Sequence, residues 1–229
     1  MKVLITGANG FLGYYLTKQL LACNHKVLAT GRGDCRLPFI GHKNFLYSPL
    51  DFTSPDDVLP ILEHHKPDVL VHAGAMSKPD DCEGQPSLAY KVNVQGTMNL
   101  LQAAKKMRSF FIFISTDFVF DGERGMYSEE DEPGPVNYYG TTKLLAETEV
   151  RQYPCEWTIV RTVLLYGKPV AGRGNILSIT KDKLKKGEEY RVVDDQLRTP
   201  TYVEDLAVGI ISIIEKKATG IFHLSGPDV

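Results

Sequence analysis

A glycine-rich turn between an apolar run and an amphipathic segment restricts the fold of this chain more than any other feature. The run KVLIT at residues 2–6 is typical of a buried parallel strand, and GANGFLG follows it with the spacing GxxGxxG. A helix is expected from about Phe11 to Asn24. Glycine permits a tight turn, a close approach of backbone N–H groups to a pyrophosphate, and close helix–strand packing. Three glycines alone would indicate only a turn, but strand, turn and helix in this order predict a dinucleotide-binding site.

The residues expected to bind the cofactor lie in this turn and after the next expected strands. They are Gly7, Asn9, Gly10, Phe11, Leu12, Gly13, Arg32, Asp51, Phe52, Ala73, Gly74, Ala75 and Asn93. The small residues at 73–75 leave room for a cofactor across a strand end. Asn93 lies within a long helix expected from Pro86 to Met107, where it could face the active site or the solvent.

Arg32 bears on which nicotinamide cofactor is bound. An NAD site usually has a carboxylate near the end of the second strand, where it bonds the ribose 2′-OH. This chain has Gly31 and Arg32 instead, and a guanidinium suits a 2′-phosphate. NADP(H) is therefore preferred and NAD(H) is possible, although Arg32 would also fit an ordinary surface loop.

A second constellation lies between residues 115 and 147. Tyr139 and Lys143 stand four residues apart, on one face of a helix expected from Asn137 to Tyr153. Thr116 and Asp117 follow the apolar strand FFIFI, so they lie at a carboxyl strand end, where open parallel sheets bind ligands. A hydroxyl, a phenol and an amine beside a hydride carrier can interconvert a carbonyl and an alcohol. The spacing alone would also fit an exposed helix pair.

The alternation of strands and helices predicts an α/β fold, a Rossmann-type doubly wound parallel sheet. We expect residues 1–165 to form the NADP(H)-binding domain and residues 166–229 a small substrate-binding lobe. The 26 basic and 28 acidic residues give no electrostatic case for binding nucleic acid or a membrane surface. The four scattered cysteines favour reduced thiols over a disulfide framework or a metal site. With no signal-peptide segment, a cytoplasmic location is expected.

Several motifs resemble the extended short-chain dehydrogenase/reductase superfamily, and within it the dTDP-4-dehydrorhamnose reductase family, which has an RmlD-like substrate-binding domain. The matching segments are TGANGFLG, STDFVFDG, YSEEDEPGPVNYYGTTKLLAE, VRTVLLYG and VVDDQLRTPTYVEDLA. The resemblance implies an NAD(P)H-dependent reductase of a nucleotide-activated 4-keto sugar, as in dTDP-rhamnose biosynthesis, which serves the building of polysaccharide. A homodimer is possible.

The resemblance also implies roles for single residues. Tyr139 would be the catalytic acid, and Lys143 its partner and a ligand of the nicotinamide ribose, so that both also bind the cofactor. Thr116 would bond the substrate carbonyl. The expected substrate-binding residues are Asp117, Val119, Gln196 and Arg198. Chemically, a free phenol titrates near pH ~10, and a lysine cation beside it should lower the pKa of Tyr139 toward neutrality.

The chain departs from that family in two segments expected to face the sugar or its nucleotide. Family members commonly carry an aromatic residue in place of Leu164 and a glycine in place of Arg198. Family members also continue beyond the position of Val229, so the substrate lobe is expected to be incomplete.

Two other functions fit the same motifs. The regulatory β subunit of methionine adenosyltransferase has similar STD, VFDG and YGxTK segments, and such a protein would bind NADP and a partner without turnover. An NAD-dependent nucleotide-sugar epimerase or dehydratase is the third possibility. Dehydratases typically add acidic residues beside the threonine, a pair that Asp117 alone does not match.

Overall fold

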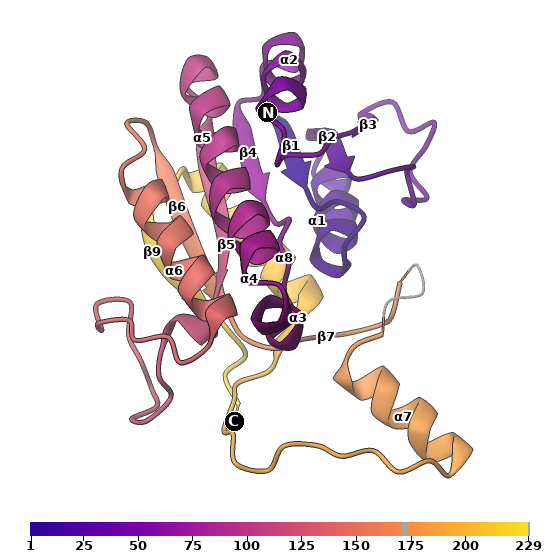
Figure 1. Ribbon diagram of the computed structural model, residues 1–229. Helices are drawn as coiled ribbons and strands as arrows, with labels where there is room; N and C mark the ends of the chain where they lie inside the picture. Colours follow the sequence, from indigo (N-terminus) through magenta and orange to yellow (C-terminus); the bar gives the residue numbers. More distant parts are fainter. Residues whose placement is uncertain (171–173, 229) are drawn as a thin grey trace.

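Seven parallel strands form the central sheet of the protein, seen in a computed structural model that describes residues 1–170 and 174–228 (Figure 1). The strand order is β3-β2-β1-β4-β5-β6-β9, and every neighbouring pair is parallel. The strands are β1 (Lys2–Thr6), β2 (Lys26–Gly31), β3 (Phe45–Pro49), β4 (Val69–His72), β5 (Phe110–Thr116), β6 (Trp157–Thr162) and β9 (Gly220–Leu224). From β1, successive strands are added first on one side (β2, β3) and then on the other (β4, β5, β6), so a topological switch point lies between β1 and β4. Ligands bind to open α/β sheets at such a point. The predicted doubly wound α/β fold is confirmed.

Helices cover both faces of this sheet (Figure 1). On one face lie α1 (Phe11–Ala22) and α8 (Val203–Lys216), and on the other α2 (Pro55–His65), α5 (Gly96–Met107) and α6 (Tyr138–Arg151). Successive strand residues point to opposite faces, so Val3 and Ile5 join the α1/α8 core while Leu4 joins the α2/α5/α6 core. Both faces are buried, which explains why the strands read as continuous apolar runs.

The helix expected from Pro86 to Met107 is interrupted by a π-turn. The structure has α4 (Pro86–Tyr90), a π-helical segment at Lys91–Gln95, and then α5. The π-turn places one extra residue in the helix, and such turns often occur at functional sites. The short α3 (Pro79–Gly84) precedes α4 and packs with it against the start of α6.

The described part of residues 166–229, which was expected to form the substrate-binding lobe, lies partly against the main sheet and partly apart from it. Helix α8 packs against α1, and β9 extends the main sheet beside β6. Helix α7 (Ile176–Lys186) instead projects away from the sheet, and none of its residues is buried (Figure 1). A separate two-stranded ladder joins β7 (Leu165–Tyr166) to β8 (Thr201–Tyr202). Helix α8 and β9 thus belong to the main sheet and its helical layers, while α7 lies apart from them. The domain boundary expected after residue 165 stays a prediction.

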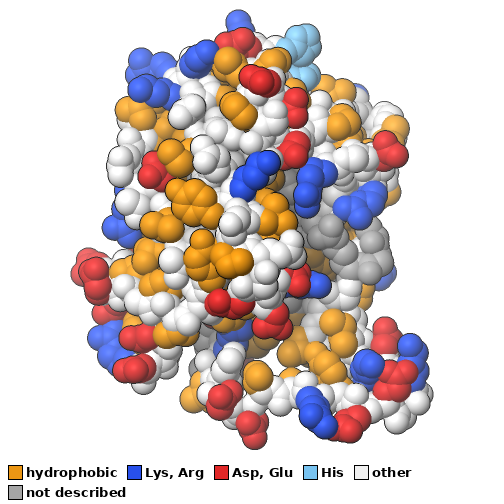
Figure 2. Space-filling model, viewed as in Figure 1, with side chains coloured by type: hydrophobic (Ala, Val, Ile, Leu, Met, Phe, Trp, Pro, Cys, Tyr) orange, Lys and Arg blue, Asp and Glu red, His pale blue; other side chains and the backbone are white. Residues whose placement is uncertain are grey.

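The surface carries both signs of charge. Figure 2 shows basic and acidic side chains interspersed over the face viewed, consistent with the formal net charge of -2. Along the part of the chain that the structure describes, every helix is too short or too polar to cross a bilayer.

A buried ion pair joins α6 to the sheet. The Glu147 carboxylate accepts hydrogen bonds from Arg161 of β6, at 3.0 Å from Nε and 2.7 Å from Nη2, and from the Ser115 hydroxyl of β5. The side chains of Glu147 and Arg161 are 0 % and 2 % exposed. The Arg161 guanidinium also lies 5.0 Å from the centre of the Phe120 ring. Both charges are thus paired and hydrogen-bonded, which a buried ion pair requires.

We expect Glu147→Ala to lower the free energy of unfolding by about 3–5 kcal/mol, because it leaves the Arg161 cation buried without its partner. Urea titration followed by circular dichroism would measure this loss. Glu149→Ala, on the same helix but partly exposed, is the control and should cost about 1 kcal/mol or less. Equal losses in the two variants would contradict a structural role for the pair.

Candidate active site

One cavity lies at the carboxyl edge of the sheet, over the switch point between β1 and β4. Its volume is about 490 Å³, and we call it the cofactor cleft. It brings together most of the residues predicted from sequence. They are Gly7, Asn9, Gly10, Phe11, Leu12, Gly13, Arg32, Asp51, Phe52, Ala73, Gly74, Ala75, Thr116, Asp117, Tyr139, Lys143 and Arg198.

The glycine turn, residues 7–13, has the shape that a dinucleotide pyrophosphate needs. Gly7 has φ +68°, and a Cβ there would lie 2.8 Å from the Ala73 carbonyl oxygen. A Cβ at Gly13 would lie 2.4 Å from the Gly7 carbonyl oxygen. Gly10 is the N-cap of α1 and has no side chain to satisfy the first N–H groups of the helix. These N–H groups and the helix dipole therefore remain available to an anion in the cleft, and the residues fit a dinucleotide cofactor.

Thr116 and Tyr139 come together because α6 approaches the end of β5 closely. Asn137 caps α6 by accepting a hydrogen bond from the Gly140 N–H at 2.8 Å. A Cβ at Gly140 would lie only 2.1 Å from the Phe118 carbonyl oxygen, so the approach requires glycine at this position. Thr116 ends β5, and its hydroxyl donates to Asp117 Oδ1 at 3.0 Å.

Lys143 lies one turn after Tyr139, beneath the cleft. Its Nζ donates to the Ile114 carbonyl at 2.7 Å and lies 3.9 Å from the centre of the Phe113 ring. The residue is only 2 % exposed. Burial lowers the pKa of Lys143 to about 7, and the nearby Glu147 carboxylate opposes this shift.

The expected effect of Lys143 on Tyr139 is not what the structure shows. Burial raises the pKa of the Tyr139 phenol well above its ordinary value, the Asp117 carboxylate adds to the rise, and a hydrogen bond with Thr116 opposes it. The residue is 8 % exposed, so loss of hydration dominates over charge effects. The Lys143 ammonium is meanwhile directed at the Ile114 carbonyl.

The residues predicted to contact substrate fall in different places. Arg198 Nη2 donates to Asp117 Oδ2 at 2.7 Å, and its guanidinium lies 4.4 Å from the centre of the Phe118 ring. Both Asp117 and Arg198 line the cofactor cleft. Val119 is fully buried, and Gln196 is exposed on the loop between α7 and β8; neither is among the residues that line the cleft.

Asn93 lies in the π-turn, behind the cleft wall. Its Oδ1 accepts from the Met76 N–H at 2.8 Å, and its Nδ2 donates to the Met76 carbonyl and to the Thr142 hydroxyl. The side chain therefore ties the loop after β4 to α6 at the level of Tyr139. Of the two orientations left open by the sequence, the structure shows the inward one.

Several residues line the cleft without having been predicted from the sequence as binding or catalytic residues. They are Gly31, Arg36, Thr53, Ser77, Val92, Ile114, Ser115, Phe118, Thr162, Val163, Leu164 and Leu165. Arg36 could have been found, because it lies in the same loop as Arg32. Leu164, noted as a departure from the related family, does line the cleft. The others depend on which strand ends lie side by side, which local patterns do not reveal.

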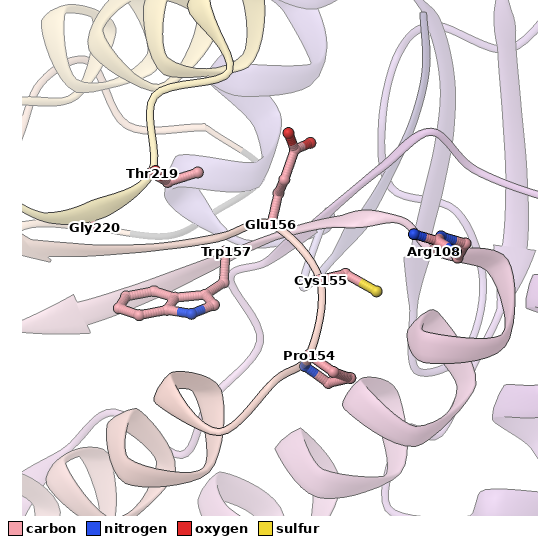
Figure 3. Close-up of a pocket in the computed structure, with 7 residues that line it drawn as sticks. All are labelled: Arg108, Pro154, Cys155, Glu156, Trp157, Thr219 and Gly220. Carbon is pink, nitrogen blue, oxygen red and sulfur yellow. The ribbon is translucent and has the colours of Figure 1, made fainter.

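A second hollow, of about 750 Å³, lies at the opposite edge, at the amino ends of β5, β6 and β9 (Figure 3). It is lined by Arg108, Pro154, Cys155, Glu156, Trp157, Thr219 and Gly220. The side chains of Glu156 and Trp157 point away from each other in Figure 3, so polar groups do not converge there. The residues with predicted catalytic roles, Thr116, Tyr139 and Lys143, line the cofactor cleft and not this hollow.

A glycine turn at the switch point, facing a threonine, a tyrosine and a lysine across one cleft, defines the class of protein. It is an extended short-chain dehydrogenase/reductase. The chain belongs to the family of the RmlD substrate binding domain, whose family model matches residues 1–229.

Two groups of curated relatives are similar to this chain. The methionine adenosyltransferase 2 subunit beta of Pongo abelii is 32% identical over 231 residues, which cover 98% of this chain and 67% of the relative. The spore coat polysaccharide biosynthesis protein SpsK of Bacillus subtilis is 30% identical over 229 residues, covering 100% and 74%.

Solved structures of dTDP-4-dehydrorhamnose reductases are also similar. The Clostridium acetobutylicum protein is 36% identical with a TM-score of 0.82, covering 98% of this chain and 74% of that one. The Bacillus anthracis protein, solved in complex with NADP, is 32% identical with a TM-score of 0.82 and the same coverage.

The buried Lys143 should make stability depend on pH. Because its pKa falls from 10.5 in the unfolded chain to about 7 in the folded protein, the unfolded chain binds the extra proton between these values. The contribution of Lys143 to the free energy of unfolding therefore rises with pH, by about 2 kcal/mol from pH 7 to pH 9.

Denaturant titrations of the wild type and Lys143→Met across this range would measure that contribution as the difference between the two proteins. Lys143→Met keeps the length of the side chain and removes the charge. The free energy of unfolding of the wild type minus that of Lys143→Met should rise with pH; a signed difference that stays constant or falls would refute the lowered pKa.

Proposed function

We propose that this protein is an NAD(P)H-dependent reductase of a nucleotide-activated 4-keto sugar, with NADP(H) as the preferred cofactor. The observation that carries the proposal is that Thr116, Tyr139 and Lys143 line the same cleft as the glycine turn. The similarity to dTDP-4-dehydrorhamnose reductases, one of them in complex with NADP, supports this substrate class and cofactor.

Each residue of this set has a chemical task in such a reaction. Bound NADPH would supply a hydride to the carbonyl carbon. The raised pKa of Tyr139 keeps its phenol protonated in this structure, so it can donate that proton to the carbonyl oxygen. The Thr116 hydroxyl would position the same oxygen. Lys143 would bond the nicotinamide ribose and, as a cation, stabilise the tyrosinate left after proton transfer.

We propose that the substrate binds on the side of the cleft that is lined by Asp117 and by Arg198, which belongs to the loop before β8. Asp117 can accept hydrogen bonds from sugar hydroxyls, and Arg198 can pair with an anionic group of the nucleotide. Val119 and Gln196 are also proposed as substrate contacts, although neither is among the residues that line the cleft. Helix α7 and residues 187–200 are the part of the predicted lobe that would carry substrate specificity.

Loss of the Tyr139 hydroxyl should slow turnover strongly and leave cofactor binding intact. NADPH oxidation over a panel of nucleotide-activated 4-keto sugars would be followed by absorbance. We expect Tyr139→Phe to lower kcat by about 10²–10⁴-fold, the usual contribution of a general acid, with the Kd for NADPH unchanged. Tyr138→Phe, the neighbouring tyrosine outside the cleft lining, is the matched control and should keep wild-type turnover. Wild-type turnover by Tyr139→Phe would refute the proposed mechanism.

A second candidate function is that of an NADP-binding subunit of a methionine adenosyltransferase. The observation that favours it is the 32% identity to proteins of that name. Such a protein would hold NADP in the same cleft and offer another surface to its partner. Co-purification with a methionine adenosyltransferase, together with no NADPH oxidation on any sugar of the panel, would favour this function over the reductase.

The third candidate is an NAD-dependent epimerase or dehydratase of a nucleotide sugar. Such enzymes regenerate their cofactor within one catalytic cycle and therefore retain it. Tightly held NAD released on denaturing the purified protein would favour this candidate. Cofactor-free protein that oxidises NADPH stoichiometrically with a keto sugar would exclude it.

A further inference from the structure

The side chain of Asn9, in the glycine turn, is bonded to the loop that follows β2. Its Oδ1 accepts a hydrogen bond from the Arg36 N–H at 3.0 Å. Its Nδ2 donates to the Asp34 carbonyl at 3.0 Å and to the Tyr47 hydroxyl at 2.9 Å. The amide thus uses both of its N–H donors and its carbonyl acceptor, and Asn9 is only 7 % exposed.

Tyr47, on β3, completes the attachment of this loop. Its hydroxyl accepts from Asn9 and donates to the Gly33 carbonyl at 2.8 Å, with the Gly31 carbonyl at 3.1 Å. Residues 31–36, which we call the arginine loop, are therefore held at both ends by two side chains. One of these belongs to the turn expected to bind the pyrophosphate.

The arginine loop carries two cations to the cofactor cleft. Arg32 and Arg36 both line the cleft, on the side of the glycine turn. Arg32 also lies near Asp51. Burial raises the pKa of the Asp51 carboxyl, but hydrogen bonds from Thr53 and then the charge of Arg32 lower it below its usual value. NADP(H) differs from NAD(H) only by a 2′-phosphate, and arginine forks bind phosphate in a fixed geometry.

We propose that Asn9 is a positioning residue that sets the preference for NADP(H), by holding the arginine loop so that Arg32 and Arg36 face the 2′-phosphate. This inference rests on the cofactor part of the proposed function. A phosphate site gains affinity when its donors are fixed before binding. Freeing the loop from Asn9 should therefore weaken phosphate binding and leave the rest of the dinucleotide site intact.

The direct test is to measure Kd for NADPH and for NADH in Asn9→Ala, by the fluorescence of the reduced nicotinamide. We expect the Kd for NADPH to rise about tenfold or more, as for a lost charge-assisted contact, and the Kd for NADH to change by less than about threefold. Tyr47→Phe removes only the hydroxyl and should shift the ratio of the two constants in the same direction. Arg36→Ala should also lower the preference.

Asn44→Ala is the matched control, because it removes an amide beside β3 from outside the cleft lining and should leave both constants unchanged. Thermal unfolding would verify that each variant is folded. An equal loss of NADPH and NADH binding in Asn9→Ala would overturn the proposal, since Asn9 would then serve only the shared turn. An unchanged ratio in both Asn9→Ala and Tyr47→Phe would overturn it as well.

These measurements need no sugar substrate, so the two claims can fail separately. A wild-type protein that binds NADPH no better than NADH would refute the role of Asn9 and leave the reductase standing. A wild-type protein that prefers NADPH but reduces no sugar would refute the reductase and leave the role of Asn9 standing.

Discussion

The position of the candidate active site depends on the buried pair of Glu147 and Arg161. Helix α6 carries Tyr139 and Lys143, and the pair ties its middle to β5 and β6, whose ends form the floor of the cleft. A buried ion pair adds little stability compared with apolar packing, but it is strongly directional. Its bidentate geometry fixes the rotation of α6 as well as its distance from the sheet. The close contact at Gly140 then brings the first turn of α6 against the end of β5.

The parts of the structure that follow from local pattern could be predicted from the sequence. The glycine turn, the strand before Thr116 and the four-residue spacing of Tyr139 and Lys143 each need only a few neighbouring residues, and the structure places them in one cleft. The π-turn at Lys91–Gln95 could not be predicted, because its one extra residue shifts the spacing of the apolar residues along the helix by only a single position. The place of β9 in the main sheet depends on pairing with β6, where Thr158 pairs with Gly220, far apart in the chain. The environment of Lys143 depends on the Phe113 ring and on burial, neither of which is visible in the motif.

The cleft has a cofactor half, formed by the glycine turn and the arginine loop, and a catalytic half, formed by Thr116, Tyr139 and Lys143. The two halves bear on different questions about function. The glycine turn and the arginine loop bear on which dinucleotide is held, and that question has the same meaning for a reductase and for a cofactor-binding subunit. Thr116, Tyr139 and Lys143 bear on proton transfer, which only an enzyme requires. The buried, protonated phenol of Tyr139 suits a proton donor. This is why the catalytic half carries the proposal of a reductase, while the similarity to methionine adenosyltransferase subunits keeps the binding function as its competitor.

The π-turn makes the length of the chain itself a constraint on the site. Each residue of an α-helix advances the rotation about the axis by about 100°. The π-turn absorbs its extra residue within one wider turn, so deleting one residue between Lys91 and Gln95 would restore an ordinary helix and keep α4 and α5 in phase. Leu100 and Ala104 would stay buried, but the narrower turn would move Asn93 away from Met76 and Thr142. An insertion of one residue outside the π-turn would instead rotate the helix beyond it by about 100°. Relatives that share this site should therefore keep both the extra residue of this segment and the asparagine within it.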